Sequence, residues 1–238
     1  MQPIPVMTRR VAAVICAALL FLSGAACAAA YGQYDIRQLL SPGPEGGKGG
    51  SLRMVYLDRM LQDIGQHAAN YPPRFDSAPD QQRAQRDAGL LMGMLNAAFG
   101  AGNNQVPPEL LLRMGLLGAY GHNLDVPDAA AFAQAHFSRL LAGRPDDPWG
   151  NYHYGQFLAS SGRGKDAMPY LGKARDKGVV PALYAMGMVH LTMGDKPKAL
   201  ALLAEYQKAE PIDQNVGKLM RGIREGKVGV ERGGGSQP

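Results

Sequence analysis

Apolar residues recur at helical spacing along most of this chain. A first run begins after Leu52 and has steps of three, four and three residues: Met54, Leu57, Leu61 and Ile64, with Val55 and Met60 beside them. This spacing places one apolar stripe on one face of a helix. The stretch NYPPRFDSAPD over 70–80 then brings three prolines. Because proline interrupts a helix, a second helix is expected over about 81–99.

Helical segments and short breaks continue to alternate as far as about residue 224. The stretch GAGNNQVPPE over 100–109 is the next break, and the pair Pro107-Pro108 stands where a helix is expected to begin. Further along, Gly143 suits a C-terminal cap and Pro145 a stop. The letters DDPW then open another helix with acids and a proline at its positive end. No segment alternates with the period of a strand, so the pattern predicts an all-α fold.

Two stretches late in the chain, 150–174 and 182–206, share residues in register. Five pairs of identical residues lie 32 positions apart: Tyr152 and Tyr184, Gly155 and Gly187, Gly162 and Gly194, Ala167 and Ala199, Leu171 and Leu203. Two helices joined by a short turn account for such a period. A small residue on the first helix lets the second approach closely. Gly162 and Gly194 are expected to end the first helix of each pair in a left-handed conformation.

This layout resembles the tetratricopeptide repeat family, a helix–turn–helix of about 34 residues. The family's glycine falls on Gly155 and Gly187 and its mid-repeat alanine on Ala167 and Ala199. Its late alanine falls on Ala174 in one repeat and on Tyr206 in the other, and its closing proline on Pro211, with Pro181 displaced between the repeats. An earlier, degenerate copy over about 112–145 contains Gly118, Ala130 and Pro145 in the same order.

The resemblance implies antiparallel helix pairs stacked as a short right-handed superhelix over 110–211, with repeats at about 112–145, 148–180 and 181–211. A helical region over 51–109 precedes them. A capping helix over 212–226 closes the last repeat through its apolar residues Ile212, Val216, Leu219, Met220 and Ile223. A generic helical bundle with coincident small residues is the alternative.

The two ends of the chain differ from this helical body. Residues 1–30 carry two arginines, an uncharged apolar run and small residues before Tyr31. This pattern is typical of a secretory signal peptide, with cleavage expected near Ala30. The alternatives are a lipidated Cys27 and an uncleaved anchor. Residues 31–50 are expected to form a flexible N-terminal arm and linker, and 227–238 a disordered tail.

Composition restricts the classes of function. The chain has 238 residues, 46% of them apolar, which suffices for one sizeable core. Removal of 1–30 lowers the formal charge from +5 to +3 and removes both cysteines, so the mature chain has no disulfide. A charge this small and dispersed does not indicate a nucleic-acid partner. No stretch after the leader is apolar enough for a membrane span, so a mature span is not expected.

The sequence offers no catalytic or metal-binding motif. None of the five histidines has a second histidine or cysteine at one-turn spacing, and no GxSxG elbow is present. The glycine–lysine stretch at 42–50 lacks the first glycine and the hydroxyl residue of a P-loop. His190, beside Val189 and Leu191, is interpreted as structural. We therefore expect no enzyme, no cofactor and no metal site.

Partner binding is the expected role. In the resembling family the first helix of each pair lines an inner groove. The positions that this implies here are Trp149, Tyr152, Gln156, Ser160, Tyr184, Met188 and Leu191, with His122 and Asn123 from the degenerate copy. Aromatic and methionine side chains provide large, adaptable contacts. The lysines, arginines and asparagines by which some family members clamp a carboxylate are almost absent from these positions. The alternative is that Trp149 and Tyr152 pack between repeats.

These observations predict a non-enzymatic exported scaffold or adaptor, periplasmic or secreted, that binds a peptide or protein in an aromatic groove. The alternative is a membrane-attached assembly factor, lipidated at Cys27 or signal-anchored, for an envelope secretion or pilus-type machine. Lipidation would associate it with the outer membrane. The arm over 31–50 is a further candidate for docking, either on this groove or on another chain, through its apolar residues Tyr31, Tyr34, Ile36, Leu39 and Leu40.

Overall fold

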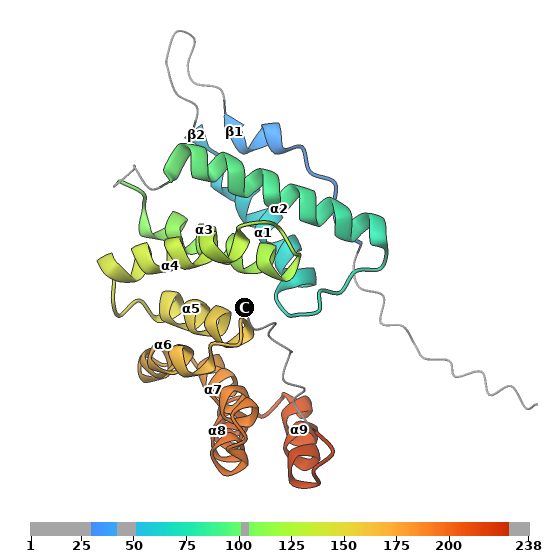
Figure 1. Ribbon diagram of the computed structural model, residues 1–238, viewed down its shortest axis with the longest axis vertical. Coiled ribbons are helices and arrows are strands. Elements are labelled where there is room, and N and C mark those ends of the chain that lie inside the picture. Colours follow the sequence, from blue (N-terminus) through green and yellow to red (C-terminus); the bar gives the residue numbers. More distant parts are fainter. Residues whose placement is uncertain (1–29, 42–50, 101–104, 229–238) are drawn as a thin grey trace, which may run out of the picture.

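A computed structural model of the protein describes residues 30–41, 51–100 and 105–228 (Figure 1). Three predictions fall outside these ranges: the leader over 1–29 with both cysteines, the glycine-rich linker over 42–50, and the tail over 229–238.

The regular elements of the described residues are helices and one pair of short strands, which confirms the all-α class. The elements are η1 Ile36–Leu39, β1 Leu40–Ser41, β2 Ser51–Leu52, α1 Met54–Ala68, α2 Ala78–Phe99, α3 Pro108–Asn123, α4 Ala129–Gly143, α5 Pro148–Ser160, α6 Gly164–Asp176, α7 Pro181–Thr192, α8 Lys196–Ala209 and α9 Gln214–Arg224. β1 and β2 pair antiparallel, with Leu40 opposite Leu52.

Capping residues mark several of the helix limits. The side chain of Asp147 accepts a hydrogen bond from the backbone N–H of Gly150 at 2.7 Å, as expected for the start of α5. Gly162 and Gly194 follow α5 and α7 with φ of 77° and 83°, which confirms their left-handed conformation. The expected cap at Gly143 is off by one residue, because Gly143 is still helical and Arg144 is the C-cap.

Three helix hairpins, α3/α4, α5/α6 and α7/α8, follow one another along the long axis of the described molecule (Figure 1). A Cβ atom added to Gly155 would lie 2.7 Å from Cγ of Leu171, and one added to Gly187 would lie 3.1 Å from Cγ of Leu203. A side chain at Gly155 would force one of the two helices to move, and one at Gly187 would require Leu203 to move by a few tenths of an ångström. The 32-residue period therefore reflects two hairpins closed by the same glycine–leucine contact.

The first hairpin closes in a different register. A Cβ atom on Gly118 would lie 2.7 Å from Cα of Ala133, whereas Ala130, which the sequence pattern paired with it, is only half-buried. The turn over 124–128 has five residues, against three between α5 and α6. Gly118 therefore faces the backbone of α4 at Ala133, whereas the glycines of the other two hairpins face a leucine.

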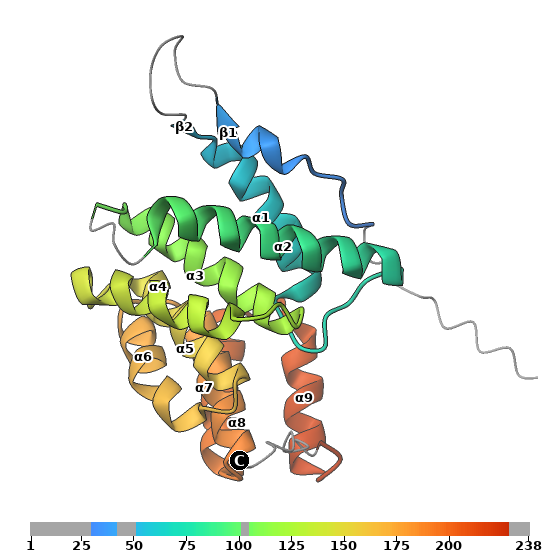
Figure 2. The ribbon, with the colours of Figure 1, turned by 45° about the horizontal axis from the view of Figure 1, so that its top comes forward.

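The region over 51–109 does not repeat the hairpin plan. Both α1 and α2 pack on α3, and in Figures 1 and 2 they cross each other steeply instead of lying side by side. The side chain of Asn123 at the end of α3 donates to the carbonyl of Ala68 at the end of α1, at 2.8 Å. Buried residues from η1 and the first four helices form one continuous core.

The first part of the arm is packed against the protein, contrary to its expected flexibility. Tyr31 is 2% exposed and its hydroxyl donates to Asp87 on α2 at 3.0 Å. The hydroxyl of Tyr34 donates to Asp63 on α1 at 2.7 Å. Leu39 is fully buried in the same core. The arm therefore docks on α1 and α2 of its own chain, because these helices offer both apolar space and carboxylate acceptors.

The closing helix α9 lies beside α8 in both views (Figures 1 and 2). Its buried residues Val216, Met220 and Ile223 share a core with Leu191 and Leu203, as a cap requires. Ile212 was expected to join them but is 90% exposed, because it lies in the turn before the helix. Val228 also packs against this core, so the chain remains ordered slightly beyond the expected start of the tail.

Candidate functional site

One face of α5 displays most of the residues expected to bind a partner. Trp149, Tyr152, Gln156 and Ser160 lie three to four residues apart and so share one side of the helix. Trp149 is 50% exposed, Tyr152 and Gln156 are half-buried, and Ser160 is exposed. Trp149 is thus the exposed aromatic side chain of this face, with Tyr152 partly covered beside it.

The open tryptophan belongs to a cluster of rings. Its ring centroid lies 5.9 Å from that of Tyr152 and 5.8 Å from that of His153, with which it stacks. Burial lowers the pKa of His153 to about 4, against the opposing charge of Asp147, so the imidazole is neutral near pH 7. The cluster therefore presents uncharged, apolar ring surface.

Tyr152 packs between neighbouring hairpins and also belongs to the ring cluster of Trp149. One side of it packs against Ala174 on α6, Val179 in the turn that follows and Ala182 on α7. Burial raises the pKa of its hydroxyl, and the hydroxyls of Tyr206 and Tyr120 raise it further. Tyr152 thus bridges neighbouring hairpins and still contributes to the ring cluster of Trp149.

A second aromatic pair lies on the last hairpin. Tyr184 on α7 is 37% exposed, and its ring centroid lies 5.5 Å from that of Tyr206 on α8. Both rings line a hollow of about 360 Å³ between α7, α8 and α9, completed by Asp213, Asn215, Val216 and Leu219. The aromatic pair Tyr184–Tyr206 and the ring cluster of Trp149 therefore lie on successive hairpins.

Two of the expected binding residues have other surroundings. Leu191 is 6% exposed and packs against Leu203 and Val216. It therefore belongs to the core, and its expected role in the binding site is wrong. The reason is its position near the end of α7, which α8 and α9 cover. Met188 is half-buried against the same core and keeps part of its surface open.

His122 and Asn123, the two residues that the degenerate first repeat was expected to add to the groove, lie elsewhere. Asn123 is 6% exposed and bound to Ala68, so it holds α3 against α1. His122 lines another hollow. Tyr120, which lies 32 residues before Tyr152, is half-buried and packs against the core of the N-terminal helices. Tyr206 was noted only as a departure from a family alanine, and Asp213 had no signal in the sequence.

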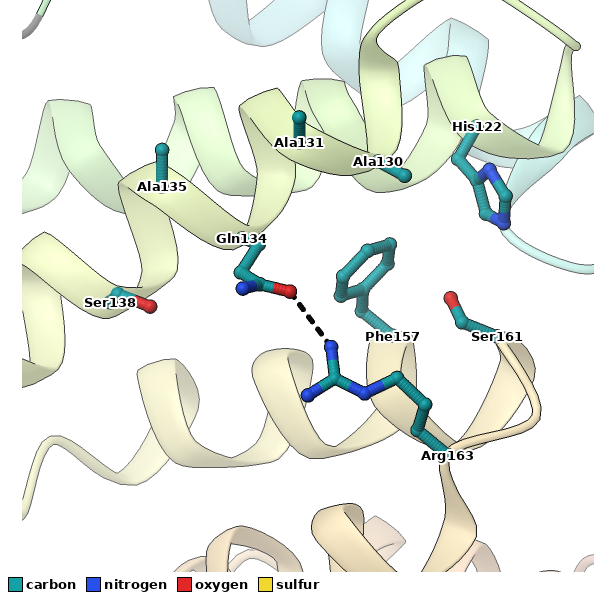
Figure 3. A pocket seen from close by; sticks show the side chains of 9 residues that line it. All are labelled: His122, Ala130, Ala131, Gln134, Ala135, Ser138, Phe157, Ser161 and Arg163. Atoms are coloured by element: carbon teal, nitrogen blue, oxygen red, sulfur yellow. Dashed lines mark hydrogen bonds between the residues drawn. The ribbon is translucent and has the colours of Figure 1, made fainter. Parts of the chain in front are cut away.

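A larger hollow, of about 490 Å³, lies between α4 and the turn after α5 (Figure 3). Its floor consists of small α4 side chains with Phe157 opposite. Arg163 donates to Gln134 at 2.7 Å across it and to Asp166 at 2.9 Å, so its guanidinium is already engaged within the protein. Three other polar side chains line this hollow: His122, Ser138 and Ser161.

Across residues 30–41, 51–100 and 105–228 no group of three or more histidine, cysteine, aspartate or glutamate side chains could hold a metal ion. Within the same ranges no helix is long and apolar enough to cross a membrane. The half-buried carboxylates Asp63 and Asp87 accept hydrogen bonds from Tyr34 and Tyr31 of the arm, whereas the buried Asp80 pairs with Arg83.

Comparison with known proteins gives no relative. No family model, no curated protein and no solved structure matches this chain.

Proposed function

We propose that this protein is an exported, non-enzymatic scaffold whose stacked helix pairs bind an extended segment of a peptide or protein partner. The observation that carries the proposal is the pair of partly exposed aromatic groups on successive hairpins, Trp149 with Tyr152 on α5 and Tyr184 with Tyr206 on α7 and α8. Half-exposed aromatic rings beside a methionine are the surface that protein partners use as binding anchors.

The proposed architecture is a short right-handed superhelix of tetratricopeptide type. Its support is the repeated glycine–leucine closure of α5/α6 and α7/α8 and the way that α5 also contacts α3 and α7. Contact between successive first helices forms the inner face of such a stack. Gln156, Ser160 and Met188 complete the proposed binding face beside the aromatic rings. A nucleic acid is not proposed, because the mature formal charge is only +3.

The test is a crosslinked pull-down from the native envelope with the tagged chain. Wild type is compared with a Trp149→Ala/Tyr184→Ala double variant and with Leu90→Ala, which removes an apolar side chain that is 54% exposed on α2. A partner retained by wild type and Leu90→Ala but lost by the double variant supports the aromatic face. Equal capture by all three overturns it, provided that circular dichroism shows the same helicity in each.

The second candidate is a membrane-attached assembly factor for a secretion or pilus-type machine. Cys27, four residues before Tyr31, is the observation in its favour, because a lipidated cysteine would tether the same scaffold to a membrane. Intact mass and detergent partitioning of the native protein separate the two. An intact mass that corresponds to a chain starting at Tyr31 supports the periplasmic or secreted form. A mass that corresponds to a chain starting at a lipid-modified Cys27 supports the tethered form.

A further inference from the structure

The hollow between α7, α8 and α9 has a chemistry that the rest of the aromatic face lacks. Two tyrosine rings form part of its wall, with centroids 5.5 Å apart and planes inclined by 60°. The carboxylate of Asp213 lies in the same wall, and Val216 and Leu219 supply apolar surface. Inclined rings and a carboxylate around one space are the elements of a cation-binding cage.

The carboxylate is held in place by the protein. One oxygen of Asp213 accepts from the backbone N–H of Asn215 at 3.0 Å and thereby caps α9. The other accepts from the hydroxyl of Tyr206 at 3.4 Å. Both bonds come from uncharged donors, so the negative charge of Asp213 is oriented but not neutralised by them.

The electrostatics of the hollow are negative. Burial and the charge of Asp213 raise the pKa of Tyr184, and burial, Asp213 and then Glu210 raise that of Tyr206. Within the part of the chain that the structure describes, Asp213 has no salt bridge to a lysine, arginine or histidine. By contrast Asp195, the corresponding cap of α8, pairs with Lys198 at 3.1 Å. The hollow therefore has an acid without a counter-ion.

We propose that Tyr184, Tyr206 and Asp213 form a cage for a cationic side chain, lysine or arginine, of the segment bound along the aromatic face. The cation lies against the ring faces and opposite the carboxylate. The aliphatic stem of the side chain packs on Val216 and Leu219, as the stems of long basic side chains do on apolar surface. This inference rests on the proposed function, since it specifies one anchor of the same partner.

The test uses the full chain, isolated after export, with carbon-13 in its tyrosine rings. It is titrated with four blocked amino acids: N-acetyl methylamides of lysine, arginine, norleucine and glutamine. Saturable shifts of the Tyr184 and Tyr206 ring signals are expected with lysine and arginine. Norleucine tests the stem alone and glutamine a neutral polar head group.

Asp213→Asn is the decisive variant, because asparagine still caps a helix but carries no charge. It should weaken lysine binding about fivefold or more, the loss expected for one close charge pair, because both tyrosine rings remain. Asp195→Asn is the matched control, with the same change of charge at the cap of α8, and should bind as wild type does. Equal binding by wild type and Asp213→Asn, or by lysine and norleucine, overturns the cage.

Free n-butylammonium is the remaining probe. Tighter binding of this small amine than of blocked lysine would assign the cage to a free amine and overturn its role in holding a protein segment. If the lysine probe fails while partner capture still depends on Trp149 and Tyr184, the cage is wrong and the proposed function stands. If both fail, the aromatic face has neither role.

Discussion

The side-chain amide of Asn123 donates a hydrogen bond of 2.8 Å to the backbone carbonyl of Ala68 and so joins the end of α3 to the end of α1. Both residues are buried. This bond fastens the first hairpin to the helices that precede it. It also removes Asn123 from the binding surface on which the repeat pattern had placed it.

Asn123→Ala should lower the free energy of unfolding by about 1–3 kcal/mol, because the carbonyl of Ala68 is left buried without this donor. Urea denaturation measures the change. Asn96→Ala, at an exposed position of α2, is the control and should stay within about 0.5 kcal/mol of wild type. Equal stability of the two variants would show that the bond contributes nothing.

Gly155→Ala should destabilise the fold by about 1–3 kcal/mol, because its Cβ would press on Leu171 and one of the two helices must shift. Thermal unfolding is the measurement. Gly172→Ala is matched to it: it changes a helical glycine of the same hairpin, with nothing within 4 Å of the added atom. That variant should gain up to about 1 kcal/mol in helix propensity. Similar shifts of the unfolding temperature in both variants would contradict the close contact between α5 and α6.

Tyr31→Phe should cost about 1–3 kcal/mol, since Asp87 loses the hydroxyl that donates to it at 3.0 Å. Burial already raises the pKa of Asp87, so this carboxylate depends on its donors. Tyr71→Phe, at a tyrosine that is 68% exposed, should leave the free energy of unfolding within about 0.5 kcal/mol of wild type. If Tyr31→Phe and Tyr71→Phe change the free energy of unfolding in urea by the same amount, the hydroxyl of Tyr31 does not contribute to stability.

Stability should fall as the pH drops from about 6.5 to about 4. His136 is 3% exposed, and burial together with Arg139 lowers its pKa from 6.5 to about 4. In this window the unfolded chain binds a proton that the folded chain excludes, so acid favours unfolding. The free energy of unfolding, measured across this range, should decline less in His136→Gln. The same decline in both proteins would exclude His136 as a cause.

Trp149→Ala should change the free energy of unfolding by less than about 1 kcal/mol, because half of the side chain is already in solvent. Phe157→Ala on the same helix should cost about 3–5 kcal/mol, because Phe157 is 5% exposed in the core. Acrylamide quenching offers an independent check, since Trp149 is the only tryptophan in the chain. A large loss of stability in Trp149→Ala would make it a packing residue and not a binding one.

Local sequence signals were sufficient to predict features that depend on a single helix, such as where the helix begins. Prolines and capping aspartates such as Asp147 mark where helices begin, because a cap satisfies backbone groups within a few residues of itself. The glycine–leucine register of α5/α6 and α7/α8 was also readable, because the same contact occurs twice at one spacing. The all-α class and the helix positions therefore follow from the amino-acid sequence alone.

Packing between distant segments decided the rest. The arm carries apolar residues that several surfaces might accept, and only the carboxylates Asp63 and Asp87 on two separate helices select its site. Leu191 and Tyr184 lie on the same helix, yet α8 and α9 cover only the first of them. Asp213 lies only seven residues after Tyr206, but the packing of α7 on α8 is what brings the distant Tyr184 to the same hollow. Such contacts depend on side chains brought together across many residues, and no local pattern records them.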